Sequence, residues 1–94
     1  MARRITQRLQ DLSQTPFPED LAEEVNGIDL KAVGTLAAGC LAQADIRGQL
    51  DDGRRRLLLQ CEIALRRAIP DVPDGRKKYF VQLADLVTDV LEDA

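Results

Sequence analysis

The chain has 94 residues, a formal net charge of −3, 45% hydrophobic and 31% charged residues, and only one tyrosine and two phenylalanines. A chain of this length forms one domain rather than two, so we expect a single helical domain over residues 1–94. Its apolar content disfavours an intrinsically disordered chain. The acidic balance disfavours nucleic acid as the partner without excluding a local basic patch.

The apolar residues recur at the spacing of helices and nowhere alternate as they do in strands. The first helix is expected over about residues 3–13, where Ile5, Leu9 and Leu12 form one stripe. A short second helix is expected over residues 18–25, because proline suits the first position of a helix and acidic residues suit its first turn.

A third helix is expected over residues 30–44, with Asp29 as its N-cap. This segment is the least polar of the chain, and a helix that is apolar on most sides is usually central in its fold. Its row of small residues, Gly34, Ala38 and Ala42, should let a neighbouring helix approach closely.

The fourth and fifth helices are expected over residues 52–69 and 74–92, after a connection over residues 45–53, with Asp74 capping the fifth. The prolines at 70 and 73 end the fourth helix and leave a short turn, which makes the last two helices antiparallel neighbours. The expected fold class is therefore all-α, a compact bundle of four to five helices with an antiparallel C-terminal helical hairpin.

Residue types that carry catalysis are scarce. The sequence has no histidine, and Ser13, its single serine, has no candidate base near it. Cys40 and Cys61 lie on apolar stripes, so we expect both to be reduced, buried and structural. No phosphate-binding loop or calcium loop is present. We therefore expect no enzyme, cofactor, metal site or membrane segment, and a cytoplasmic protein; an enzyme built from carboxylates and arginines is the remaining catalytic alternative.

Charged residues fall in blocks along the expected hairpin. At one end, the arginines at 54–56 should meet the acidic end of the fifth helix, which contains Asp89, Glu92 and Asp93. At the other end five cations should converge to form a candidate patch for an anion or an acidic partner: Arg66, Arg67, Arg76, Lys77 and Lys78. The alternatives are a solvated patch and one that the acidic residues of the second helix neutralise.

An apolar surplus on the last two helices, at Leu59, Ile63 and Leu86, indicates a candidate interface with another protein or with a second copy of the chain. The sequence thus predicts a small, non-catalytic helical protein–protein interaction module, such as a regulator, an adaptor or an antitoxin- or immunity-type inhibitor. The alternative is a nucleic-acid- or phosphate-binding regulator that uses the basic patch at the turn of the hairpin.

Overall fold

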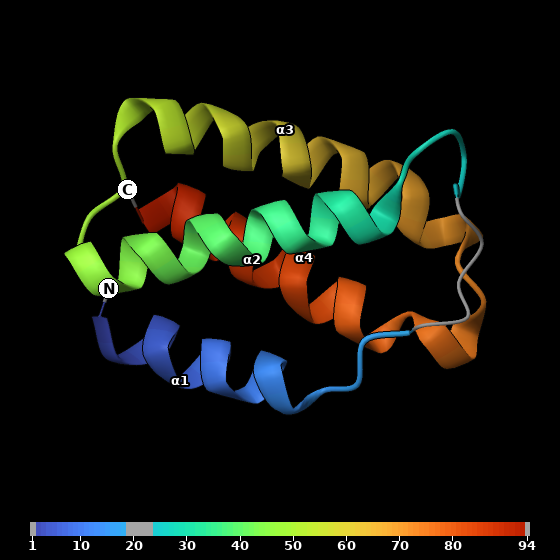
Figure 1. The fold of residues 1–94 in the computed structure, drawn as a ribbon, viewed down its shortest axis with the longest axis horizontal. Helices are drawn as coiled ribbons and strands as arrows, with labels where there is room; N and C mark the ends of the chain where they lie inside the picture. The colour runs from blue at the N-terminus through green and yellow to red at the C-terminus, as the bar shows by residue number, and fades with distance from the viewer. Residues whose placement is uncertain (1, 19–23, 94) are drawn as a thin grey trace.

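The computed structural model describes residues 2–18 and 24–93, with side chains described for residues 6–18 and 24–92. Two short 3₁₀ turns, η1 (Ile69–Asp71) and η2 (Asp74–Arg76), join the last two helices. Across these described residues the chain forms four α-helices and no strand: α1 (Ala2–Gln14), α2 (Leu30–Arg47), α3 (Asp52–Ala68) and α4 (Lys78–Asp93) (Figure 1). The all-α bundle expected from the sequence is confirmed.

The capping residues explain where α2 and α3 begin and end. The Asp29 side chain accepts a hydrogen bond from the Ala32 N–H at 3.1 Å, as expected of the N-cap of α2. This helix continues three residues beyond the expected end and stops where Gly48 adopts a left-handed φ of 71°. Asp51 then caps α3 by accepting from the Arg54 N–H at 2.8 Å. The expected connection over residues 45–53 is therefore shorter than predicted.

The start of α4 differs from the prediction. Asp74 was expected to cap the fifth helix, but it heads the 3₁₀ turn η2 instead, and α4 begins at Lys78. The Arg76 N–H donates to the Pro73 carbonyl at 2.8 Å, an i→i+3 bond that belongs to the tighter helix. Gly75, which disfavours an α-helical first turn, lies within this segment.

A two-residue turn precedes α2. The Asn26 φ is 57° and the Gly27 φ is 77°, and the backbones of Val25 and Ile28 pair on either side at 2.9 and 3.0 Å. The Asn26 side-chain amide donates to the Arg67 carbonyl at 3.1 Å, which ties this turn to the end of α3. The predicted helix over residues 18–25 lies mainly on residues 19–23, outside the described residues; Pro18, Glu24 and Val25 are not helical.

The core lies where α2, α3 and α4 meet, and α4 supplies its most deeply buried face, with Phe80, Leu83 and Val87 fully buried. Both α2 and α4 pack against all three other helices, so the expected central position of α2 is shared with α4. The outer face of α2 is open to solvent, as the exposure of Leu36 and Ile46 shows.

The small residues of α2 differ in their burial and in what they contact. Gly34 is buried where α2 meets an aromatic cluster, in which the rings of Phe17 and Phe80 lie 5.6 Å apart, edge to face. Ala38 is half-buried and Ala42 is exposed, and both line a groove against α1. A close contact was expected along the row Gly34, Ala38 and Ala42. The structure shows it at Gly34 alone among these three residues.

Candidate functional site

Arg66 and Lys77 of the candidate basic patch form ion pairs with carboxylates of the same chain. Arg66 Nη2 donates to Asp85 Oδ1 at 3.1 Å and to Thr88 Oγ1 at 3.0 Å, both on α4. Lys77 Nζ lies 3.3 Å from Asp74 Oδ1. The paired carboxylates offset the positive charge that Arg66 and Lys77 present to a partner.

The other three cations lie near a hollow beside η2 or on the surface of α3. Arg67 is exposed on α3, and Lys78 is exposed at the start of α4. Arg76 is half-buried and interacts within the chain. Arg76 and Lys78 line a hollow of about 440 Å³ together with Thr15. The structure thus brings two of the five predicted residues to one hollow.

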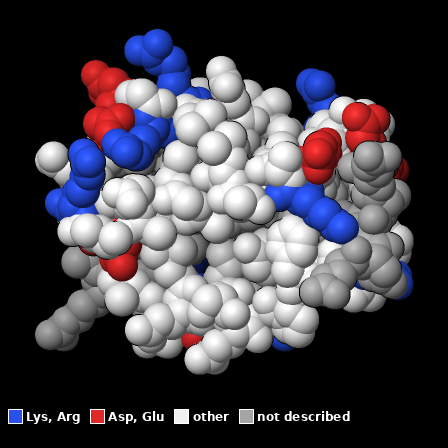
Figure 2. Space-filling model, viewed as in Figure 1, with Lys and Arg blue, Asp and Glu red and all other residues white. Residues whose placement is uncertain are grey.

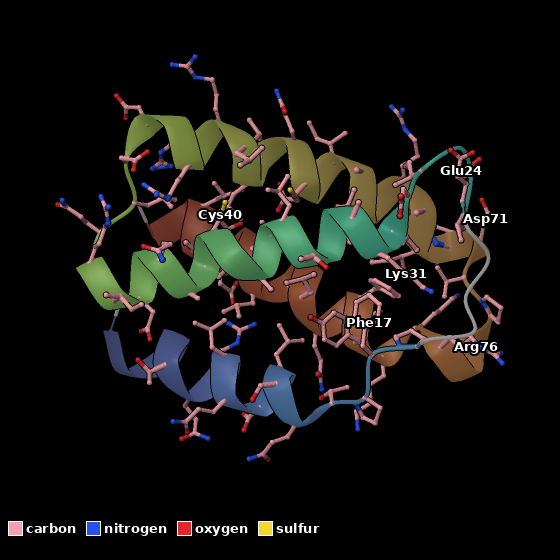
Figure 3. All side chains as sticks on the ribbon, viewed as in Figure 1. Phe17, Glu24, Lys31, Cys40, Asp71 and Arg76 are labelled. Carbon is pink, nitrogen blue, oxygen red and sulfur yellow. The ribbon has the colours of Figure 1, made fainter. Side chains whose placement is uncertain are left out.

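Carboxylates share this end of the molecule with the cations. Figure 3 shows the labelled side chains of Glu24 and Asp71 at the same end as those of Lys31 and Arg76. The end where α2 begins and α3 finishes is therefore mixed in charge rather than uniformly positive.

Among the described side chains, which do not include that of Asp93, no ion pair joins the arginines at the start of α3 to the acidic end of α4 as expected. Arg54 pairs with Asp51, the N-cap of its own helix, and hydrogen bonds from the Arg54 N–H and guanidinium lower the pKa of that carboxyl below its ordinary value. Arg55 Nη1 donates to the Leu91 carbonyl at 3.2 Å. Asp89, which was expected to meet these arginines, pairs with Arg8 of α1. Asp89 was expected to pair with α3 because only the last two helices were considered. In the structure α1 supplies its arginine.

Large apolar side chains are exposed on two neighbouring helices. Leu59 and Ile63 of α3, both predicted at an interface, are 47% and 53% exposed. Leu86 was placed with them, but it is 1% exposed and belongs to the core, because α1 covers that side of α4. The structure adds two residues of α2, Leu36 and Ile46, which are 46% and 77% exposed. The low polarity of residues 30–47 on most faces was the feature of the sequence that indicated exposed apolar residues on this helix.

The middle of one face of the molecule is largely uncharged. In Figure 2 the lysines, arginines, aspartates and glutamates gather toward the sides of this view, and the uncharged band between them crosses the middle of α2 and extends over its neighbours α3 and α1. Leu36 and Ile46 are the large apolar side chains that α2 exposes. A partner that covered this band would meet few charges at its centre and more at its edges.

A groove lies between α1 and α2, which run side by side in opposite directions (Figure 1). It has a volume of about 460 Å³ and is mainly apolar. The Thr6 hydroxyl donates to Asp45 Oδ1 at 2.5 Å and closes one end. Ile46 lies at its edge, and Ala38 and Ala42 leave it room. The row of small residues is visible in the sequence, but the sequence does not show that α1 lies beside it.

Polar side chains also connect α3 to α4. The Thr88 hydroxyl donates to Glu62 Oε2 and accepts a hydrogen bond from Arg66 at 3.0 Å. Glu62 and Arg66 were recognised in the sequence as a pair one helical turn apart, and the structure joins them through a residue of another helix. These contacts hold two helices together.

The chemistry available to the described residues is limited. Cys40 and Cys61 are both free and buried, as expected, and burial raises the pKa of each thiol. Among the described side chains of residues 6–18 and 24–92, no group of three Cys, Asp or Glu residues could hold a metal ion. No described helix is both long and apolar enough to cross a membrane. No family model matches the chain, and neither a curated protein nor a solved structure shows significant similarity to it.

Proposed function

We propose that this chain is a small, non-catalytic protein–protein interaction module that acts as a regulator, an adaptor or an antitoxin- or immunity-type inhibitor. The observation that carries this proposal is the exposure of large apolar side chains in pairs on two neighbouring helices: Leu36 and Ile46 on α2, and Leu59 and Ile63 on α3. Covering such a side chain completely is worth about 1.5–3 kcal/mol. Because these four side chains are 46–77% exposed, a partner that covered them would gain about half to three quarters of that value from each, which contributes to binding alongside other contacts.

The charge distribution supports the same proposal. Interfaces commonly have an apolar centre that lacks charged residues and a polar rim. The face that α2 shares with α1 and α3 has this arrangement, since its uncharged band lies between charged regions (Figure 2). Charges at a rim steer a partner into one orientation rather than supply most of the affinity. The partner is either another protein or a second copy of this chain.

Single substitutions on the two helices test the proposal. Ile46→Asp places a charge on the α2 pair, and Ile63→Asp places one on the α3 pair. Gln43→Asp and Gln60→Asp are matched controls, because they add the same charge at exposed polar positions of the same helices. Each variant is used to capture partners from the source cells, and binding is then measured again with the purified partner.

We expect at least one isoleucine variant to lose the partner that the parent and its glutamine control retain, with thermal melting unchanged. A loss confined to Ile46→Asp would place the interface on α2, and a loss confined to Ile63→Asp would place it on α3. If the parent captures no partner, or if all four variants capture it equally, the proposal is wrong.

A nucleic-acid- or phosphate-binding regulator is the second candidate. It is supported by the hollow that Arg76 and Lys78 line beside Thr15, which is large enough for a phosphate group. The ion pairs of Arg66 and Lys77 within the chain count against it, as does the mixed charge at this end of the molecule. It is therefore the second candidate, and reversing the charges of Arg67 and Lys77 separates the two functions.

A further inference from the structure

The length of the groove between α1 and α2 matches two turns of a helix. Thr6 and Asp45 lie at one end of it, and Ser13 and Ala38 lie toward the other. The helical rise from Thr6 to Ser13 is about 10.5 Å, which is also the distance from residue i to residue i+7 of any α-helix. A helix placed along the groove can therefore present two turns of apolar side chains to it.

The lining of the groove suits an apolar occupant. Leu9 and Leu12 contribute from α1, and Ala38 and Ala42 contribute from α2. The alanines leave room for side chains that come from outside. Ile46, with 77% of its surface exposed, lies at the edge, where an occupant would cover it.

Asp45 places a carboxylate at one end of the groove. Asp45 is half-buried and accepts a hydrogen bond from the Thr6 hydroxyl at 2.5 Å, but no lysine or arginine among the described side chains pairs with it. In contrast, Asp51, Asp85 and Asp89 each pair with an arginine. A carboxylate beside an apolar surface forms a strong, charge-assisted hydrogen bond with a cation that approaches along that surface.

We infer that the groove binds an amphipathic helix of a partner protein, and that a lysine or arginine at the end of its apolar stripe pairs with Asp45. The inference rests on the proposed function and identifies the partner's docking element and its charge. Helix-in-groove binding supplies affinity through apolar anchors spaced at i, i+3 or i+4, and i+7. The ion pair fixes the direction in which the helix lies, because Asp45, at one end, is the carboxylate among the described residues that line the groove.

A displayed library of amphipathic helices tests this inference without knowledge of the natural partner. The library keeps an apolar stripe over two turns and randomises the residues that flank it, and it is selected against the parent protein. Binding of a selected peptide is then measured with two groove variants, Asp45→Asn and Ala42→Leu. Asp52→Asn and Gln43→Leu are the matched controls, because they remove the same charge and introduce the same leucine at exposed positions outside the groove.

We expect the selected peptides to carry lysine or arginine at one end of the stripe. Asp45→Asn should weaken their binding up to about fivefold, the range of a partly exposed ion pair, while still accepting a hydrogen bond from Thr6. Ala42→Leu should weaken binding more than about tenfold, because the added side chain occupies the groove. Both controls should bind as the parent does.

Three outcomes would overturn the inference: no enrichment in the selection, enrichment without basic residues, or binding that is insensitive to Ala42→Leu. Self-association of the parent that Ala42→Leu abolishes, seen by sedimentation, would also overturn it and would make a second copy the occupant. If the library fails while capture of the natural partner still depends on Ile63, the groove assignment is wrong and the proposed function stands.

Discussion

Gly34 is the residue of α2 that has least space for a side chain. A β-carbon at this position would lie 3.4 Å from Phe17 Cε2, 3.5 Å from Phe80 Cε1 and 3.8 Å from Leu83 Cδ2. These are contact distances, so a single methyl group fits, while valine adds two further carbon atoms beside the same three side chains. We expect Gly34→Ala to raise the free energy of unfolding by up to about 1 kcal/mol, because alanine favours the helix. Gly34→Val should lower it by about 1–3 kcal/mol through overpacking.

Urea unfolding measures both effects, and Gly39→Ala is the matched control. Gly39 is an exposed residue of the same helix, and a β-carbon there would meet nothing within 4 Å. Its substitution therefore reports the helical preference of alanine alone. Equal stability of Gly34→Val and the parent would show that α2 does not approach Phe17 and Phe80 as closely as described.

The cap of α3 makes part of the stability depend on pH. The pKa of Asp51 is lowered in the folded protein, because the backbone N–H and then the guanidinium of Arg54 donate to its carboxylate. A carboxyl of this kind stabilises the fold above its unfolded pKa, about 3.9, and loses that contribution as the pH falls through the lowered value. We expect Asp51→Asn to lower the urea midpoint near neutral pH, and the difference from the parent to shrink below about pH 3.

The control for this pH dependence is Asp52→Asn. It changes the same charge one residue along and removes no described hydrogen bond. A difference between Asp51→Asn and the parent that stayed constant down to the lowest pH would contradict the role assigned to the Asp51 carboxylate.

At the level of elements, Thr88 joins α4 to α3. Its hydroxyl donates to Glu62 and accepts from Arg66. Thr88→Val keeps the shape of the side chain and removes both hydrogen bonds, so we expect the free energy of unfolding to fall by about 1–2 kcal/mol. Thr35→Val, at an exposed position of α2, should change it by less than about 0.5 kcal/mol. Equal effects of the two substitutions in thermal melts would contradict the proposal that the hydrogen bonds of Thr88 stabilise the contact between α3 and α4.

The periodicity of single helices predicted where α1, α2 and α3 begin, because each start is set by residues next to one another in the chain. It did not predict the start of α4, where Gly75 and the preceding proline favour a 3₁₀ turn. It also placed Leu86 on the surface. The width of a buried face depends on how many helices cover it, and α4 has α1, α2 and α3 as neighbours.

The candidate sites show the same limit. The exposure of Leu59 and Ile63 could be read from their position outside the main stripe of α3, and the structure agrees. The groove beside Asp45 could not be predicted, because it forms between two helices whose contact is not encoded in the spacing of either one. The pairing of Asp89 with Arg8 was missed for the same reason.

For the molecule as a whole, the distribution of charge decides between the two proposed functions. Arg67→Glu together with Lys77→Glu reverses two cations of the candidate patch. We expect the parent to bind random DNA and RNA weakly or not at all across a salt series, because its net charge of −3 repels phosphate. The double variant should therefore behave like the parent in filter-binding or anisotropy measurements.

Arg47→Glu with Arg56→Glu is the control, since it changes the charge equally at exposed positions away from the η2 hollow. The second candidate, a nucleic-acid-binding regulator, would be correct if the parent bound nucleic acid tightly and the binding weakened steeply with salt. That binding would also have to survive in this control and disappear in the Arg67 and Lys77 variant. Each phosphate contact would then add close to one unit to the salt slope.

The packing of α1 against α4 has a consequence for how the protein is made on the ribosome. Arg8 meets Asp89 across 81 positions, and Thr15 meets Gln82 across 67. The ribosome adds about 5–20 residues per second, so α1 emerges several seconds before α4 exists. During that time Leu9 and Leu12 of the nascent chain lack part of the surface that later covers them. Chaperones that bind exposed apolar segments therefore have their best opportunity in this interval, which ends when α4 leaves the exit tunnel.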